Sequence, residues 1–364
     1  MKRLAFSIST LSLFLAADIA GAQNLVLHNT LGSASEILSS VVGPPLTFGS
    51  RPIAYVGAPG GSGMTIAASG GGNAPVLLPG LPGLVNPEQG CVECVFQMTA
   101  LPIAFNSNPF LLFDGDFGAG SGLGLEVWRT YSGTVDLIGF VEFGGARVAA
   151  LNPAFPTRLG YPAEALARRW LHVALVWDRA GIAGGADTVR LYLNGVIVGS
   201  ATATSWGTTV GPNAEIGGAN DCCPHQKLHY DDVKLWDAAK TTFAPTFNVW
   251  FQSPDGPGSV TVSNGGSATG RTAFNVLSID PANAGLGAGI GPFFGLHVSF
   301  ADVVTQFLTF SPPFLAPMDA FGGMRFDVPA GGLPSGLAIY AVALDFHPDF
   351  TIAGVSPVIA HLIP

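Results

Sequence analysis

The segment Trp170-Leu171-His172-Val173-Ala174-Leu175-Val176-Trp177 is almost uniformly apolar, and an alternating run follows it, Val189-Arg190-Leu191-Tyr192-Leu193. Next come Asn194-Gly195 and then Val196-Ile197-Val198. Side chains of a strand point alternately to its two faces, so a period of two predicts strands. Asn-Gly between such runs is a strong hairpin signal, because a type I′ turn needs positive φ at both central residues. The uniformly apolar segment predicts a strand inside a sheet, covered on both sides.

The same pattern extends along most of the chain, where short apolar runs end at Gly, Pro, Asn or Asp. Gly (49) and Pro (28) make up about a fifth of the 364 residues, and both disfavour regular helix. The chain is 48% hydrophobic and only 11% charged, with a mean hydropathy of +0.43. This composition predicts an all-β protein of about two domains, and it excludes a disordered chain. Residues 161–169 are the one expected helical turn of the first half.

The charge balance excludes one class of partner. The formal net charge is -9, and only 15 residues are Lys or Arg. A nucleic-acid-binding protein needs a basic surface to neutralise phosphates, so we expect no nucleic-acid partner.

The N-terminus predicts export. Lys2 and Arg3 precede an apolar stretch over 4–17, and the small residues Ala20-Gly21-Ala22 follow. This arrangement predicts a secretory signal peptide over residues 1–22. The alternative is a membrane anchor, but the apolar run is shorter than the roughly 20 residues that a span requires, and Asp18 ends it. We therefore expect a secreted or cell-surface protein without a transmembrane segment in its mature chain.

A second domain is expected after the pattern breaks at 241–245. A new series of strands begins at Phe247, and the segment Ala301–Phe310 predicts a short helix with Val304, Phe307 and Leu308 on one face. The domains are therefore expected at 23–243 and 246–364. The other strands expected in the second domain are Gly258–Ser263, Thr272–Ser278, Gly295–Ser299, Met324–Val328, Gly336–Asp345 and Val358–Ile363.

Four motifs in the first domain follow one another in a recognisable order. They are Trp170–Ala174, Val189–Gly195, Glu215-Ile216-Gly217-Gly218 and Tyr230–Trp236. Their order and spacing resemble the laminin-G-like, concanavalin A-like jelly rolls over roughly residues 90–242. The resemblance implies a two-sheet antiparallel sandwich with a groove on one face.

The second domain resembles a C-terminal β-module seen on many secreted bacterial proteins. The resemblance rests on Gly291–Leu296, Asp319–Gly322 and Gly336–Leu344. It implies a smaller β-sandwich and no particular chemistry. The expected fold is thus a jelly roll followed by this module.

No catalytic residues are assigned from the sequence. Retaining glucanases of the jelly-roll fold carry Glu, then Asp two residues later, then Glu four or five residues from the first. Only Glu88 and Glu93 have such a separation, and the residue two after Glu88 is Gly90. Sequence motifs of nucleophilic triads and zinc proteases are absent as well. His172 is expected to be a satisfied core histidine, and Asp231-Asp232 a solvent-facing pair that braces a loop.

Two metal hypotheses concern the loops. Cys222, Cys223 and nearby His and Asp side chains suggest zinc, but vicinal cysteines do not match the usual ligand spacing. The resemblance favours calcium on the rim, with oxygen ligands from two loops. Two ordinary Asp-containing turns remain the alternative. The expected calcium ligands are Asp114, Asp116, Asn220 and Asp221.

The cysteines of an exported chain are expected to form disulfides. In the fold that this chain resembles, the strand beginning near Cys91 neighbours the last strand, 228–236. The resemblance therefore implies that Cys91 and Cys94 pair with Cys222 and Cys223, in an order that the sequence leaves open.

These features together predict a secreted, non-catalytic binding or adhesion protein whose partner is an extracellular glycan or a surface protein. The alternatives are a structural component of an envelope or matrix, and a diverged glycoside hydrolase. Trp128, Tyr131 and Trp206 could stack on sugars, but they could equally belong to the core, so no ligand-binding residue is assigned.

Overall fold

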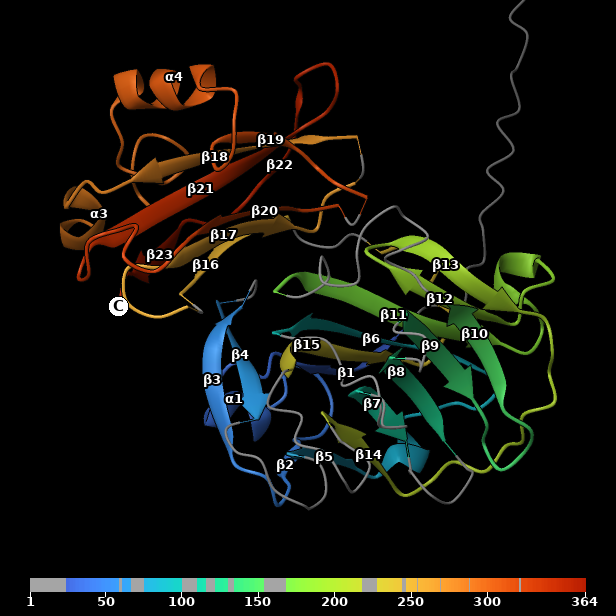
Figure 1. Cartoon of the computed structure of the whole chain (residues 1–364). Helices are drawn as coiled ribbons and strands as arrows, with labels where there is room; N and C mark the ends of the chain where they lie inside the picture. Colours follow the sequence, from blue (N-terminus) through green and yellow to red (C-terminus); the bar gives the residue numbers. More distant parts are fainter. Residues whose placement is uncertain are drawn as a thin grey trace, which may run out of the picture.

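The computed structural model describes residues 24–58, 61–66, 75–99, 110–115, 122–129, 134–153, 168–217, 228–243, 247–253, 255–268, 270–287, 289–320 and 322–364. Its strands form antiparallel sheets, two in each half of the chain (Figure 1). The expectation of an all-β jelly roll followed by a smaller β-sandwich is confirmed.

In the described part of the chain, the first domain is a sandwich of an eight-stranded and a seven-stranded sheet, here sheet A and sheet B. Sheet A contains β1 (Leu25–Asn29), β3 (Ile53–Ala58), β4 (Gly61–Ile66), β6 (Gln89–Met98), β11 (Trp170–Asp178), β12 (Val189–Leu193), β13 (Val196–Ala201) and β15 (Leu228–Trp236). Sheet B contains β2 (Thr47–Phe48), β5 (Val76–Pro79), β7 (Phe110–Gly115), β8 (Leu123–Arg129), β9 (Val135–Val141), β10 (Val148–Asn152) and β14 (Asn213–Ile216). The short helical turns α1 (Ala34–Ile37), η1 (Leu81–Gly83) and η3 (Ile182–Gly184) lie between strands.

The apolar segment that opened the sequence analysis is β11, and it lies inside sheet A between β6 and β12. Its inner side chains, such as Val173 and Leu175, belong to the main core between the two sheets. Its outer side chains Ala174 and Val176 belong to a second apolar cluster. The predicted coverage of both faces is therefore confirmed. The predicted hairpin is confirmed too, since φ is 48° at Asn194 and 80° at the following glycine.

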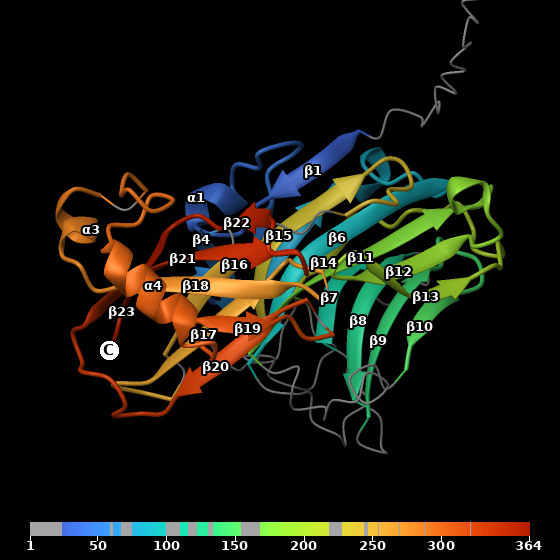
Figure 2. The same ribbon diagram turned by 90° about the horizontal axis from the view of Figure 1, so that it is seen from above.

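The C-terminal module is also built from two sheets. Sheet C contains β16 (Asn248–Gln252), β17 (Val260–Gly265) and β20 (Met324–Val328). Sheet D contains β18 (Thr272–Ser278), β19 (Leu315–Pro317), β21 (Ala338–Phe346), β22 (Ile352–Val355) and β23 (Ile359–Leu362). The helices are α3 (Ala282–Gly285) and α4 (Phe300–Leu308). Figures 1 and 2 show α4 lying on sheet D, and in Figure 1 sheet C is the layer nearer to the first domain.

Two expectations for this module are wrong. Residues 295–299 form no strand, because φ is positive at Phe294 (48°) and Gly295 (90°) and the chain turns there. The helix exists, but its buried face contains Val303 and Phe307. Val304, by contrast, is exposed.

The expected helical turn and the expected aromatic side chains have different outcomes. The turn was expected over 161–169, and most of this range lies outside the described residues. Trp206 is a core residue, 1% exposed, whose Nε1 donates to the Pro87 carbonyl at 2.9 Å. Tyr131 is outside the described residues, and Trp128 lies in β8.

Within the described ranges, no helix is both long and apolar enough to span a membrane.

The two domains are docked through sheet C. Trp170 of β11 and Trp250 of β16 pack together with Ala58 of β3 in an apolar cluster. Beside this cluster, the amides of Gln97 and Gln252 exchange two hydrogen bonds of 3.1 and 2.8 Å. The module thus covers part of the outer face of sheet A.

Candidate ligand pocket between the two domains

A pocket of about 550 Å³ opens where the outer face of sheet A meets sheet C. Its volume is in the usual range for small-molecule sites, roughly 300–1,000 Å³. Strands β1, β6, β11 and β15 form its floor, and residues of the C-terminal module line the opposite side. The pocket therefore belongs to both domains.

Strand alternation on β6 explains how a charged residue reaches the pocket. Val92, Cys94 and Phe96 point into the main core. The intervening residues Glu93 and Val95 point to the outer face and line the pocket. Glu93 remains only 4% exposed, so its carboxylate requires partners.

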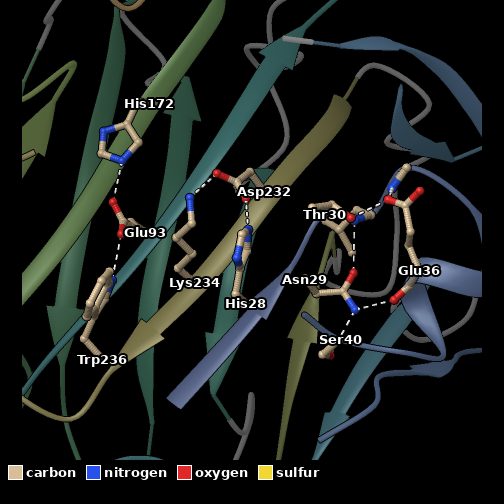
Figure 3. A network of polar contacts seen from close by, with 12 residues as sticks. His28, Asn29, Thr30, Glu36, Ser40, Glu93, His172, Asp232, Lys234 and Trp236 are labelled. Atoms are coloured by element: carbon tan, nitrogen blue, oxygen red, sulfur yellow. Dashed lines mark hydrogen bonds and ion pairs between the residues drawn. The ribbon is translucent and has the colours of Figure 1, made fainter. Parts of the chain in front are cut away.

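Three donors from different segments satisfy the Glu93 carboxylate, and Figure 3 shows two of them, His172 and Trp236. Oε2 accepts from His172 Nε2 at 2.8 Å, and Oε1 accepts from Trp236 Nε1 at 2.7 Å and from Lys240 Nζ at 2.8 Å. Burial by itself would raise the pKa of Glu93, but the hydrogen bond and charge of His172, together with those of Lys240, lower this pKa to about 2. Glu93 is therefore an ionised acceptor across the ordinary pH range.

This ionised acceptor determines the tautomer of His172. A carboxylate only accepts hydrogen bonds, so His172 Nε2 carries the proton that it donates to Glu93. The other ring nitrogen, Nδ1, is buried and has no hydrogen-bond partner among the described residues. Nδ1 is thus an unused ring nitrogen in a side chain that lines the pocket, and it accepts a hydrogen bond when the ring is neutral and donates one when the ring is protonated. His172 was expected to be a core histidine with its hydrogen bonds satisfied. This is correct for Nε2, which donates to Glu93, and wrong for Nδ1, which has no partner among the described residues.

A second polar group lies beside the first, on β1 and β15 (Figure 3). His28 Nε2 and Lys234 Nζ both contact the carboxylate of Asp232. The pairing of β15 with β6 shifts between Asp231 and Lys234, and φ is 56° at Asp232. Such a bulge interrupts alternation, and both consecutive aspartates line the pocket. The expectation that the pair faces solvent is wrong for Asp231, which is only 2% exposed.

Tryptophan side chains supply much of the apolar wall. Trp170 and Trp250 are 5% and 4% exposed, and both line the pocket. Neither indole N–H has a hydrogen-bond partner within the described part of the chain. The third tryptophan of the wall, Trp236, already donates to Glu93. The first domain therefore contributes one indole N–H without a partner, that of Trp170, and the C-terminal module contributes another, that of Trp250.

The expected calcium ligands lie elsewhere. Asp114 is a buried residue of β7 in sheet B, where it pairs in register with Glu215 of β14. Asp116, Asn220 and Asp221 are outside the described residues. Since β7 and β14 are antiparallel, the two expected ligand loops leave this strand pair at opposite ends. No group of three metal-ligating side chains occurs among the described residues, and the calcium site stays a prediction.

The cysteines of β6 face opposite sides, as expected. Cys91 belongs to the outer cluster and Cys94 to the main core, and no disulfide joins these two described cysteines. Burial raises the pKa of each thiol. The expected neighbourhood of β6 and β15 is confirmed, but Cys91 lies opposite Trp236, at the end of β15 away from residues 222–223. Cys222 and Cys223 are outside the described residues, so the cross-link stays a prediction.

Sequence reasoning did not find this pocket. Glu93 was considered only as part of a glucanase motif, and Trp206, which was weighed as a sugar contact, is a core residue. A signal was available, because Glu93 is the one charged residue in the ten-residue strand Gln89–Met98. A buried charge in such a strand requires hydrogen-bonding partners, and the residues that supply them to Glu93 lie at the pocket.

Comparison with known proteins agrees with this architecture. Residues 142–243 match the concanavalin A-like lectin/glucanases superfamily. The match covers the second half of the first domain, whose two antiparallel sheets form the expected jelly-roll sandwich. No curated protein sequence matches the chain.

Solved structures similar to the chain have low sequence identity. Domain 4 of AbnA, an extracellular arabinanase from Geobacillus stearothermophilus solved with arabinotriose, is 18% identical with a TM-score of 0.40, and the match covers 60% of this chain and 94% of that one. The botulinum neurotoxin serotype G binding domain is 10% identical with a TM-score of 0.47, covering 93% and 81%. The binding domain of Paraclostridial Mosquitocidal Protein 1 is 10% identical with a TM-score of 0.45, covering 70% and 58%.

Proposed function

We propose that this protein is a secreted, non-catalytic binding protein that holds a carbohydrate in the pocket between its two domains. The observation that carries the proposal is the unused ring nitrogen of His172, which the Glu93 hydrogen bond orients beside a tryptophan-lined wall. Secretion is supported by the signal-like segment over residues 1–22.

The proposed ligand class follows from the chemistry of the wall. A sugar combines apolar ring faces with hydroxyl groups that both donate and accept hydrogen bonds. Tryptophan offers a large apolar surface with one polar donor, and His172 Nδ1 offers an acceptor. A sugar ring against the indoles, with a hydroxyl paired to His172 Nδ1, would use the groups that the protein leaves without partners, after a small opening of the wall exposes these buried atoms.

The state of Glu93 supports binding without catalysis. A glycoside hydrolase needs a carboxylic acid whose pKa is raised, so that it can protonate the leaving group. The pKa of Glu93 is instead lowered to about 2, because the hydrogen bonds and charges of His172 and Lys240 overcome the effect of burial. Glu93 therefore orients His172 and has no proton to transfer.

A glycan array tests this proposal, using the chain from residue 23 to 364 so that both sides of the pocket are present. Titration calorimetry then measures the affinity for each sugar that binds. We expect reproducible binding and no release of reducing sugar. Failure to bind throughout the array, or reducing-sugar release above background, would contradict the proposal.

Substitution of His172 provides the sharper measurement. We expect His172→Phe to weaken sugar binding by about tenfold or more, since an unpaired polar group costs about 1–3 kcal/mol. His347→Phe is the matched control, because His347 is exposed in a turn and does not line the pocket. Equal affinities of the two variants would refute the role of Nδ1.

A further inference from the structure

We propose that the C-terminal module is the second half of the binding site, so that the sugar is bound only while the module is docked on the first domain. This inference rests on the proposed function. It gives the module, to which sequence alone assigns no chemistry, a specific role in recognition.

The module contributes directly to the pocket wall. Asn248 and Trp250 of β16 line it, together with Gly265, Gly266 and Pro357. A Cβ at Gly265 would meet the Trp250 ring at 2.8 Å, so glycine allows the indole to lie close to β17. Each domain also supplies one indole N–H that has no partner among the described residues, Trp170 in the first domain and Trp250 in the module. Removing the module would remove one side of the pocket.

Among the described residues, polar pairs supplement the apolar cluster that docks the module on the first domain. Outside the cluster around Trp170 and Trp250, Arg168 contacts Asp255 with two hydrogen bonds of 3.0 and 2.8 Å. Its neighbour Arg169 pairs with Asp319 of the module. Polar interfaces of this kind within one chain resemble transient ones, and relative motion of the domains is expected. Docking is therefore an equilibrium that a ligand can shift.

A sugar that contacts both tryptophans binds the docked form and not the undocked form. Binding must then favour docking, and loosening the docking must weaken binding by the same factor. The ion pair between Arg168 and Asp255 offers a way to separate these effects, since neither residue lines the pocket.

The experiment uses the chain from residue 23 to 364 and four neutral probes, the hexasaccharides cellohexaose, maltohexaose, xylohexaose and chitohexaose. Affinities are measured by calorimetry and domain docking by small-angle scattering. We expect Asp255→Lys to increase the radius of gyration and to weaken binding at least fivefold. The exchange Arg168→Asp with Asp255→Lys restores the ion pair and should recover most of the affinity. Glu142→Lys is the control, because it breaks a surface pair with Arg147 within the first domain.

Trp250→Ala tests the direct contribution of the module, whether or not docking changes. We expect it to weaken binding at least tenfold, with the far-ultraviolet circular dichroism of the chain preserved. Wild-type affinity in the Trp250 variant, or in an Asp255 variant that scattering shows to be undocked, overturns the inference and leaves the proposed function intact. If the wild-type chain binds none of the four sugars and none on the array, the proposed function fails and the inference fails with it.

Discussion

Replacement of Glu93 by Gln tests the organisation of the pocket most directly. The change keeps the shape of the side chain but removes the charge that accepts from His172, Trp236 and Lys240. A Gln amide also offers only one acceptor oxygen for these three donors. We expect Glu93→Gln to destabilise the first domain, with a loss that depends on pH.

The magnitude follows from the pKa of Glu93, which is lowered from 4.5 to about 2 in the folded chain. At about 1.4 kcal/mol per pH unit, this difference corresponds to a stabilisation of about 3 kcal/mol at pH 7. The side chain is only 5% exposed, so screening by solvent is small. Because the folded-state pKa is depressed, the contribution is complete above pH 4.5 and is lost as the pH falls toward 2. At pH 3 about 1 kcal/mol should remain.

Urea unfolding of the wild type and the variant, followed by circular dichroism at pH 7 and at pH 3, measures this difference. Glu88→Gln is the control, since the Glu88 side chain is 53% exposed and its pair with Arg179 lies at the surface. We expect the control to change stability by less than about 1 kcal/mol. Equal losses for Glu93→Gln and Glu88→Gln, or a Glu93→Gln loss that stays constant between the two pH values, would refute the reasoning.

Three further predictions concern parts of the chain that the sequence singled out. Limited proteolysis should cut near 241–245 and leave two stable fragments, and resistance at that point would count against two independently folded domains. Millimolar calcium should raise the melting temperature of the wild type and leave that of Asp116→Ala unchanged. At a hundredfold excess over the dissociation constant, the expected gain in the free energy of unfolding is about 2.7 kcal/mol. An unchanged wild-type melting temperature refutes the site. Peptide mapping without reduction should find cross-linked peptides that join the two cysteine pairs, and alkylation of Cys91 and Cys94 after unfolding without reductant would exclude this cross-link.

The sequence predicts most strands of this protein because their signals are local. Alternation and an Asn-Gly turn identify the hairpin after β11, and the apolar run of β11 itself predicts a central strand. The expectation for residues 295–299 fails for an equally local reason. Positive φ at Phe294 is rare for a residue with a side chain, and composition does not reveal it.

The helix α4 shows a different kind of error. Its existence follows from its sequence, and Ser299 caps it by accepting from the Asp302 amide. Which of its apolar residues are buried depends on where sheet D lies. Phe307 contacts Phe274 of β18, whereas Leu308 is exposed.

The sequence by itself determined the β class, the central position of β11 in its sheet and the hairpin that follows it. Only the tertiary structure decided what surrounds Glu93, because its partners His172, Trp236 and Lys240 come from positions 79 to 147 residues away along the chain. The pocket also depends on Trp250, which reaches it through the docking of a separate domain. Strand formation follows from the period of neighbouring residues, whereas a binding site requires distant side chains to converge, and no local pattern encodes that convergence.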